Sequence, residues 1–198
     1  ERMFERPGQL ALAGPTGAAN ALAAIAAAVA RGVPDEVIAA ALAAFAGVPN
    51  RLERVVSCDG VTFINDTSAT APVAAAATIR LLADRGEALV VIAGGADKAS
   101  DFAPMADAIA ETGAPLVLLD GSGTARLRGR LRERGIDPGP AFGSLAEAVE
   151  AALAIEERPL TVALSPGCAS FGMFRNEFDR GEQFRRLARD WCQQSHRG

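Results

Sequence analysis

Three short apolar runs separated by helical patterns constrain the fold of this chain more than any other feature. The runs occupy residues 89–93, 116–119 and 160–164, and each ends in a turn rich in glycine or serine. Helical patterns lie between and beyond them, at about 73–83, 102–112, 123–134, 144–156 and 179–193. Because strands that alternate with helices join into parallel sheets, the sequence predicts an α/β fold with a Rossmann-like, mainly parallel sheet flanked by helices.

A β-hairpin is predicted before this alternation begins. The runs 55–58 and 61–64 flank Asp59 and Gly60, which tolerate the positive φ that a two-residue hairpin turn requires. The last helical pattern, at the other end of the chain, places four apolar side chains on one face: Phe184, Leu187, Ala188 and Trp191. We expect this helix to cover the sheet with the others.

The first 48 residues predict a helical hairpin. Apolar residues recur on one helical face at Leu22, Ile25 and Val29, and on a second at Val37, Ile38, Ala41, Leu42 and Phe45. Gly32 supplies a helix stop, and Pro34 and Asp35 supply a helix start with Asp35 as the N-cap candidate. Two such helices are too small for a stable domain, so we assign residues 1–48 to a larger unit and residues 49–198 to the α/β domain.

The composition argues against several classes of function. The 198 residues are 49% hydrophobic and carry a net charge of -4, so a nucleic-acid partner is not expected. No apolar run approaches the roughly 20 residues that span a bilayer, and charged residues within 1–6 stand where a signal peptide has its apolar core. We therefore expect a cytoplasmic protein without a membrane partner.

The cysteines and the histidine offer little for metal binding or nucleophilic catalysis. Cys58, Cys168 and Cys192 include no CxxC pair, and His196 is the only histidine. We therefore expect neither a protein-only metal site nor a Cys/His nucleophile pair, and we interpret these residues as ordinary packing or surface groups.

The predicted topology brings four polar loops to one edge of the sheet, because parallel strands joined by right-handed crossovers point their carboxyl ends the same way. The loops are 65–72, 94–98, 120–123 and 165–170. They offer an amine, hydroxyls and backbone N–H groups, which suit carboxylates or phosphates. Purely structural interpretations remain open: Asp66 can simply end a strand, Lys98 can be a surface lysine, and Arg51 can be a solvated linker residue.

Five segments resemble motifs of the MurD-type Mur ligases. Residues 65–72, Asn-Asp-Thr-Ser-Ala-Thr-Ala-Pro, resemble the family's Asn-Asp-Ser-Lys-Ala-Thr-Asn-Pro signature. Residues 94–98 and 165–170 resemble its Gly-Gly-x-x-Lys loop and its Ser-Pro-Ala-Cys-Ala-Ser segment. Residues 14–24 resemble its Gly-x-His-Asn-x-x-Asn-Ala-Leu-Ala-Ala stretch, and residues 49–53 resemble its Pro-His-Arg-Phe-Glu hinge. The similarity covers the end of the central domain and the C-terminal domain of such a ligase.

The resemblance implies an ATP-dependent ligase that adds glutamate to UDP-N-acetylmuramoyl-L-alanine through an acyl phosphate, in peptidoglycan synthesis. It implies a glutamate site formed by Lys98, Thr70, Ser170 and Phe171. It also implies an ATP site that includes Asn20, Arg51, Asp66 and Ser68, with Asp66 accepting hydrogen bonds from the ribose. We expect the full-length enzyme to be a monomer.

The chain contains no Gly-x-x-Gly-Lys-Thr/Ser phosphate loop. The resemblance therefore implies that Mg²⁺ is bound mainly by a part of the central domain that this sequence lacks. For the same reason, we expect this chain to have no ligase activity by itself.

Several positions depart from the family pattern. Thr16 and Gly17 replace a histidine and an asparagine, and Ser68 replaces a lysine. Residues 174–181, Phe-Arg-Asn-Glu-Phe-Asp-Arg-Gly, also resemble the family's Lys-Asn-aromatic-Glu-x-Arg-Gly segment, which forms the side wall of the glutamate pocket. Glu177 and Phe178 depart from that pattern. D-Glutamate is the family default, but these departures leave L-glutamate open. Two other functions also stay open: a non-catalytic Rossmann-type module that binds a nucleotide or anion, and a folylpolyglutamate-synthase-like ligase.

Overall fold

In a computed structural model, the chain is described over residues 14–155 and 157–195, which divide between Val48 and Pro49 into two compact units. His196 and the segment 1–6 lie outside the described residues. The first unit contains α1 (Gly14–Ala30) and α2 (Asp35–Ala44), as the helical periodicity predicts.

The start of α2 differs from the prediction. Asp35 is not the N-cap, because Pro34 occupies that position without a side-chain hydrogen bond and Asp35 is the first helical residue. Its carboxylate then lies in the first turn of α2, where a negative charge interacts favourably with the helix dipole.

Much of the apolar surface of the first unit is exposed. Leu22, Val29 and Val37 are 55%, 53% and 54% exposed, whereas Ile38 is buried. Both helices of the first unit therefore carry exposed aliphatic side chains.

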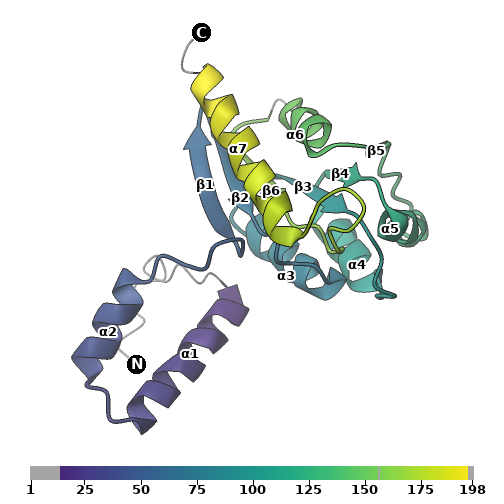
Figure 1. Cartoon of the computed structure of the whole chain (residues 1–198). Coiled ribbons are helices and arrows are strands. Elements are labelled where there is room, and N and C mark those ends of the chain that lie inside the picture. The colour runs from purple at the N-terminus through teal and green to yellow at the C-terminus, as the bar shows by residue number, and fades with distance from the viewer. Residues whose placement is uncertain (1–13, 156, 196–198) are drawn as a thin grey trace. The chain divides into compact units, whose positions relative to one another are not determined.

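The second unit is built on a six-stranded sheet with the strand order β1-β2-β6-β3-β4-β5 (Figure 1). The strands are β1 (Glu53–Cys58), β2 (Val61–Asn65), β3 (Ala88–Gly94), β4 (Leu116–Leu119), β5 (Ala141–Phe142) and β6 (Leu160–Leu164). β1 pairs antiparallel with β2 through the predicted hairpin, and every other pair of neighbours is parallel. The predicted fold class is confirmed. β5 is missing from the prediction because two residues are too few to form a pattern.

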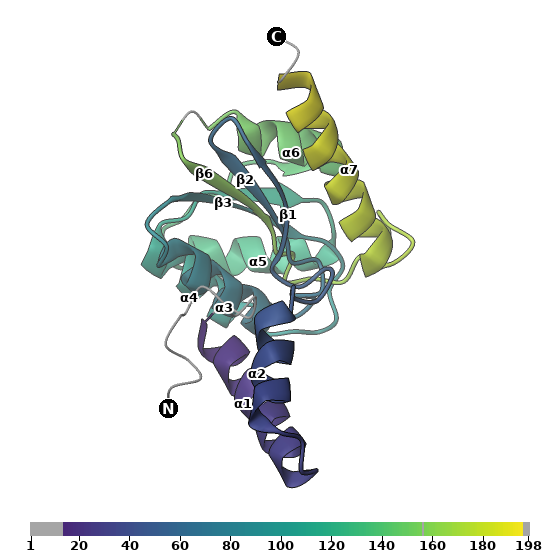
Figure 2. The ribbon, with the colours of Figure 1, turned by 90° about the vertical axis from the view of Figure 1, so that its left-hand side faces the viewer.

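Helices cover both faces of this sheet (Figures 1 and 2). One face packs against α3 (Pro72–Ala83), α4 (Ala103–Thr112) and α5 (Ser122–Arg132), and the other against α6 (Leu145–Leu153) and α7 (Glu177–Ser195). Along β3, Val91 and Ala93 belong to the first core, while Val90 and Ile92 belong to the second. Burial on both faces explains why the central strands are continuous apolar runs in the sequence.

The apolar face predicted for the last helix lies in the second core. Phe184 and Ala188 of α7 are fully buried, and Trp191 is partly buried against the same cluster. The rings of Phe184 and Trp191 both contact Phe63 of β2 edge to face, with centroids 6.1 and 5.6 Å away. α7 is therefore fixed along the β1–β2 side of the sheet.

A disulfide joins Cys58, at the end of β1, to Cys192 in α7. The interpretation of these two cysteines as ordinary packing or surface residues is therefore wrong. The two residues are 134 positions apart, and spacing could not reveal the pair because β1 and α7 become neighbours only in the folded sheet. Cys168 is free and buried.

The N-terminal part of α7 approaches the β2 side of the domain closely enough to require glycine at position 181. A Cβ on Gly181 would lie 2.3 Å from Oδ1 of Asn50 and 2.8 Å from Cγ2 of Thr67. Both of these side chains are buried, so neither can move away freely.

We predict that Gly181→Ala lowers the free energy of unfolding by about 1–3 kcal/mol, because the added methyl group overpacks this contact. Gly129→Ala is a matched control, since Gly129 lies within α5 and a Cβ there would meet nothing within 4 Å. The control should stabilise the protein by about 0.5–1 kcal/mol through helix propensity. Urea unfolding of both variants measures the difference, and equal effects would contradict the close approach of α7.

Candidate functional site

Main-chain hydrogen bonds tie together the loops that follow β3 and β6. The N–H of Gly94 donates to the carbonyl of Pro166 at 2.9 Å. Two residues further on, Ala96 and Ala169 form an antiparallel bridge. The loop that carries Lys98 and the loop that ends at Ser170 are therefore parts of one small backbone structure.

The other two loops join the same structure. The N–H of Gly167 donates to the carbonyl of Ala69 at 2.8 Å, which connects the β6 loop to the β2 loop. The N–H of Gly123 donates to the carbonyl of Gly95 at 2.8 Å, which connects the start of α5 to the β3 loop. The predicted meeting of four loops at the carboxyl edge of the sheet is therefore present in the structure.

Two glycines allow the loops to cross at these distances. Gly95 has φ +130°, and a Cβ there would lie 2.5 Å from the carbonyl oxygen of Ala169. Gly121 has φ +152°, and its Cβ would lie 2.3 Å from the carbonyl oxygen of Gly95. Any side chain at either position would separate the loops, so the edge geometry depends on these residues.

Lys98 presents an exposed ammonium group at this edge. It is the only lysine of the chain, in which the other 19 basic residues are arginines. Its Nζ lies 5.9 Å from the centroid of the Phe171 ring, close enough for a weak cation–π contact. Within the described residues, Lys98 has no carboxylate partner.

The neighbouring carboxylate does not neutralise Lys98, because it is paired elsewhere. Asp97 accepts a hydrogen bond from Arg126 at 2.6 Å, and this contact lowers the pKa of Asp97. The N–H of Asp97 donates to Ser122, and the N–H of Ser100 donates to Asp97. The loop is thus fixed on both sides of an exposed ammonium group.

Two hydroxyl groups and an aromatic ring lie on the loops tied to that of Lys98. Thr70 is half-buried, Ser170 is 3% exposed, and Phe171 is 63% exposed. Neither hydroxyl forms a hydrogen bond within the part of the chain that the structure describes. One cation and two unused donors on connected loops can bind an anion with two or more oxygens.

Asp66 is buried and already bound to the protein. Its Oδ2 accepts hydrogen bonds from Thr78 at 2.7 Å and Ser165 at 2.8 Å, and its Oδ1 accepts one from the N–H of Leu52 at 3.1 Å. Burial raises the pKa of Asp66 above its ordinary value of 3.8, and the three donors offset this only in part. The carboxylate therefore holds the β2 loop, α3, the β6 loop and the segment before β1 together.

Arg51 is exposed on a backbone that is held tightly. Its neighbours Asn50 and Leu52 both have positive φ, at +67° and +46°, which is uncommon for residues other than glycine. The N–H of Ser68 donates to the carbonyl of Asn50 at 3.0 Å, and the N–H of Leu52 donates to Asp66. Arg51, Asp66 and Ser68, which the sequence predicts on the ATP side, are therefore neighbours in the structure.

A buried polar network that the sequence analysis missed supports this segment. Glu53 accepts hydrogen bonds from Arg185 of α7, from Asn65 and from the N–H of Asn50. Arg185 also donates to Oδ1 of Asn50 at 2.6 Å. Burial opposes ionisation of Glu53, but these donors outweigh it and lower its pKa. The residues around Arg185 in the sequence do not indicate its contact with Glu53, which is 132 residues away.

The sequence analysis also missed Arg180. This residue lies in the first turn of α7, is fully buried and donates to Thr67 of the β2 loop and Cys168 of the β6 loop. A charged residue within an amphipathic helix is ordinarily solvated, so periodicity does not predict its burial. The available signal was the resemblance of residues 174–181 to the family's Lys-Asn-aromatic-Glu-x-Arg-Gly motif, in which Arg180 and Gly181 match the final Arg-Gly.

Asn20, the remaining residue predicted for the ATP site, does not belong to the second unit. Asn20 lies on α1 in the first unit, where its side chain is exposed.

Burial raises the pKa of Cys168 to about 12, so its thiol stays protonated near neutral pH. Residues 14–155 and 157–195 contain no group of three or more His, Cys, Asp and Glu residues arranged for a metal ion. No helix in the same ranges is long and apolar enough to cross a membrane.

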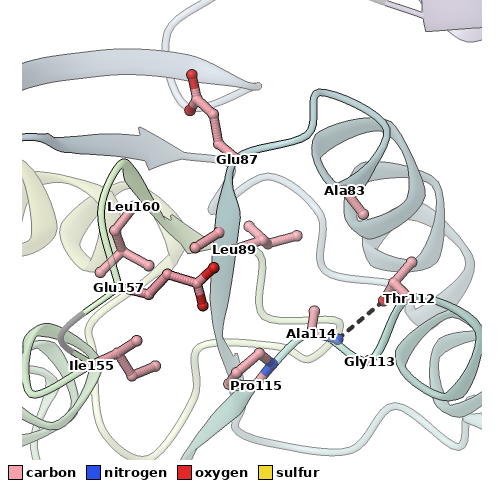
Figure 3. A pocket seen from close by; sticks show the side chains of 11 residues that line it. Ala83, Glu87, Leu89, Thr112, Gly113, Ala114, Pro115, Ile155, Glu157 and Leu160 are labelled. Atoms are coloured by element: carbon pink, nitrogen blue, oxygen red, sulfur yellow. Dashed lines mark hydrogen bonds between the residues drawn. The ribbon is translucent and has the colours of Figure 1, made fainter.

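A hollow of about 220 Å³ lies at the opposite edge of the sheet (Figure 3). It is lined at the amino ends of β3, β4 and β6 by residues such as Leu89, Pro115 and Leu160, with Glu87 and Glu157 among the lining residues. None of the predicted site residues lines it. We therefore place the candidate site at the carboxyl edge, where the unpaired polar groups lie.

Comparison with known proteins finds one family over most of the second unit. The family described as "Mur ligase, glutamate ligase domain" matches residues 50–168. A UDP-N-acetylmuramoylalanine--D-glutamate ligase from Roseiflexus sp. (strain RS-1) is 48% identical over 170 residues, which make up 85% of this chain and 36% of that protein. The chain thus spans about a third of the length of that relative.

Solved structures show the same fold. The UDP-N-acetylmuramoylalanyl-D-glutamyl-2,6-diaminopimelate--D-alanyl-D-alanyl ligase from Acinetobacter baumannii superimposes with a TM-score of 0.60 at 22% identity, over 86% of this chain and 36% of that one. Folylpolyglutamate synthase from Thermotoga maritima superimposes with a TM-score of 0.56 at 20% identity, over 88% and 39%. At these identities, the likeness concerns the fold alone.

We predict that Asp66→Asn changes how stability depends on pH. Because the pKa of Asp66 is raised in the folded state, its contribution to stability is largest below the ordinary value of 3.8 and is lost as pH rises through the raised value. The Asn variant lacks this loss, so its free energy of unfolding should improve relative to wild type as pH increases above about 4. Urea unfolding at several pH values up to 7 provides the measurement.

Asp84→Asn removes an exposed carboxylate and serves as the matched control. A difference between wild type and Asp66→Asn that stays constant with pH, or that grows in favour of wild type, would contradict the assignment of Asp66 as a buried anchor.

Proposed function

We propose that this chain, which belongs to the Mur ligase family described as the glutamate ligase domain, binds glutamate. It would do so as part of a longer ATP-dependent ligase. The acceptor would be UDP-N-acetylmuramoyl-L-alanine, in peptidoglycan synthesis. The observation that carries the proposal is that Lys98, Thr70 and Ser170 have no hydrogen-bond or ion-pair partner for their polar side-chain groups among the described residues, on loops joined by main-chain hydrogen bonds. The family membership confirms the resemblance found in the motifs.

We assign the two units to two domains of that longer protein. Residues 49–198 would be the C-terminal glutamate-binding domain, and residues 1–48 would be the last helices of the central ATPase domain. The exposed Leu22, Val29 and Val37 support the second assignment, since preceding parts of the polypeptide could cover them. We also propose that the full-length protein is a monomer.

The glutamate site would work by charge and by shape. The ammonium of Lys98 would bind a carboxylate of glutamate, and the hydroxyls of Thr70 and Ser170 would donate to carboxylate oxygens. The exposed ring of Phe171, next to Lys98, would cover the bound amino acid from one side. Binding through its carboxylates leaves the amine of glutamate free to react.

The reaction would then require mainly alignment. ATP supplies a phosphoryl group that converts the acceptor carboxylate into an acyl phosphate. The amine of glutamate attacks the carbonyl carbon, a C–N bond forms, phosphate leaves with the C–O bond electrons, and the nitrogen loses a proton. By holding glutamate at a fixed edge of the sheet, this domain would contribute orientation to the step.

The ATP side would be formed around Arg51. Its exposed guanidinium, on a backbone fixed by Asp66 and Asn50, fits the role of a phosphate ligand. Ser68 and Asn20 would add polar contacts to the nucleotide. Asp66 accepts three hydrogen bonds within the protein, so we expect it to act on ATP mainly by fixing the Arg51 segment. Mg²⁺ would be held mainly by the part of the central domain that this sequence lacks.

We propose D-glutamate as the substrate, because the relative from Roseiflexus is named for it. Glu177 and Phe178, which depart from the family motif, lie at the start of α7, and the carbonyl of Glu177 accepts a hydrogen bond from Thr67. Phosphate release by the full-length protein, measured with D- and L-glutamate in parallel, decides the enantiomer.

Activity with a folate acceptor instead of the UDP-linked one would favour the folylpolyglutamate synthase alternative.

The proposed reaction places the protein in the cytoplasm, where its nucleotide substrates occur. Disulfides are uncommon in that compartment. We therefore expect Cys58 and Cys192 to be thiols in the cell and to form their bond on oxidation.

We predict that Lys98→Ala in the full-length enzyme raises the KM for glutamate by roughly 10- to 100-fold, because a charge-assisted contact to a carboxylate is lost. The KM for ATP should change by less than about 3-fold. Arg85→Ala, which removes an exposed positive charge near the amino edge of the sheet, is the control. Steady-state phosphate release gives both constants.

Equal increases in the two KM values would remove Lys98 from the glutamate site. Absence of any glutamate-dependent phosphate release by the wild-type enzyme would instead favour the non-catalytic binding module.

A further inference from the structure

Arg180 is a buried cation whose hydrogen-bond acceptors among the described residues are neutral, while the nearby charge of Glu177 acts on it electrostatically. Its Nε donates to the hydroxyl of Thr67 at 2.9 Å, and one terminal nitrogen donates to the carbonyl of Thr67 at 3.1 Å. Both terminal nitrogens lie 3.3 Å from the carbonyl oxygen of Cys168. The ring of Phe174 lies 5.9 Å from its guanidinium carbon. Within the described residues, no carboxylate forms an ion pair with Arg180.

Such an arrangement is a poor choice for stability alone. Taking a guanidinium out of water carries a large desolvation penalty, and neutral acceptors offset only part of it. Burial lowers the pKa of Arg180 to about 10, so the side chain remains charged at neutral pH. An apolar residue of similar size would fill the space without this desolvation penalty. The function of the guanidinium therefore lies in the segments that it connects.

The guanidinium connects the two loops that carry the hydroxyl groups of the candidate site. Thr67 stands three residues before Thr70 in the β2 loop, and Cys168 stands two residues before Ser170 in the β6 loop. The hydroxyl of Thr67, which accepts from Arg180, donates in turn to the carbonyl of Glu177 at 3.0 Å. α7, the β2 loop and the β6 loop therefore share one hydrogen-bonded centre.

Only a planar fork can make these contacts together. Arginine presents donors in fixed directions, whereas a lysine ammonium is a single point charge. The same loops are also joined by the main-chain hydrogen bond from Gly167 to Ala69 and by the hydrogen bond from Ser165 to Asp66. Of these contacts, those of Arg180 are the ones that also join both loops to α7.

We propose that Arg180 is a positioning residue that sets the spacing and angle between Thr70 and Ser170, so that both hydroxyls meet the carboxylates of one glutamate molecule. This inference rests on the proposed function. Arg180 itself does not touch the substrate. It acts on specificity for the amino acid and has no direct part in nucleotide binding.

The test uses the full-length enzyme with Arg180→Met and Arg180→Lys. Because a misplacement of about 1 Å can cost roughly 100-fold, we expect both variants to raise the KM for glutamate by roughly 10- to 100-fold. The KM for ATP should stay within about 3-fold of wild type. Arg189→Met removes an exposed arginine from the same helix and should leave both constants unchanged.

A second variant keeps the proposal testable if the changes at Arg180 prevent folding. Thr67→Val retains the shape of the side chain but removes the hydroxyl that joins Arg180 to the carbonyl of Glu177. It should raise the KM for glutamate by roughly 3- to 10-fold, also without a comparable change for ATP. Circular dichroism and urea unfolding show which variants fold.

The possible results are distinct. If Arg180→Lys restores the wild-type KM for glutamate, charge rather than geometry matters and the inference is wrong. It is equally wrong if folded variants raise both KM values together, as a general structural defect would. A wild-type enzyme that releases phosphate without any dependence on glutamate would contradict the proposed function, and with it this inference.

Discussion

The crossing of the β3 and β6 loops is the constraint on which the rest of the site depends. Gly94 donates to Pro166, and Ala96 pairs with Ala169, so two chain segments are held in contact just beyond the sheet. The contact is possible because Gly95 adopts a positive φ and has no side chain at the crossing. Lys98 and Ser170 stand two residues and one residue beyond this pair, so the crossing fixes the separation of their loops.

Helix α7 stabilises the two sides of the edge through different arginines. Arg180 joins the β2 and β6 loops near Thr70 and Ser170. Arg185, five residues further along, joins Glu53 and Asn50 next to Arg51. The contacts of Phe184 and Trp191 with Phe63 place α7 on the sheet, and Gly181 allows the N-terminal part of the helix to approach closely. One helix therefore supports both the proposed glutamate side and the proposed nucleotide side.

Much of the fold could be predicted because strands and turns are indicated by short, local sequence patterns. The apolar runs that become β3, β4 and β6, and the Asp59-Gly60 turn, depend on neighbours in the chain. The bond between Cys58 and Cys192 and the contact of Arg180 with Thr67 could not be predicted in this way, since they join segments more than 100 residues apart. Such pairs are determined by strand order and helix packing, which no single segment encodes.

Asp66 illustrates the same limit for the site. Its position after a strand identifies it as a candidate, but only the fold shows that Thr78, Ser165 and Leu52 use its oxygens. Lys98 is the opposite case. A single lysine among 19 arginines, directly after a buried strand and two glycines, is visible in the sequence. Its lack of an ion-pair partner within the described residues agrees with a role in binding an anion.

The central claim is that Lys98, Thr70 and Ser170 form one site for an amino acid with two carboxylates. Reductive methylation of this 198-residue chain with ¹³C-formaldehyde labels only Lys98 and the terminal amine and keeps their positive charge. NMR titration with D- and L-glutamate should shift the Lys98 methyl signal in a saturable way. Alanine should have little effect, and Thr70→Val and Ser170→Ala should each weaken binding. A signal that neither enantiomer shifts, or a shift that both substitutions leave unchanged, would contradict the claim.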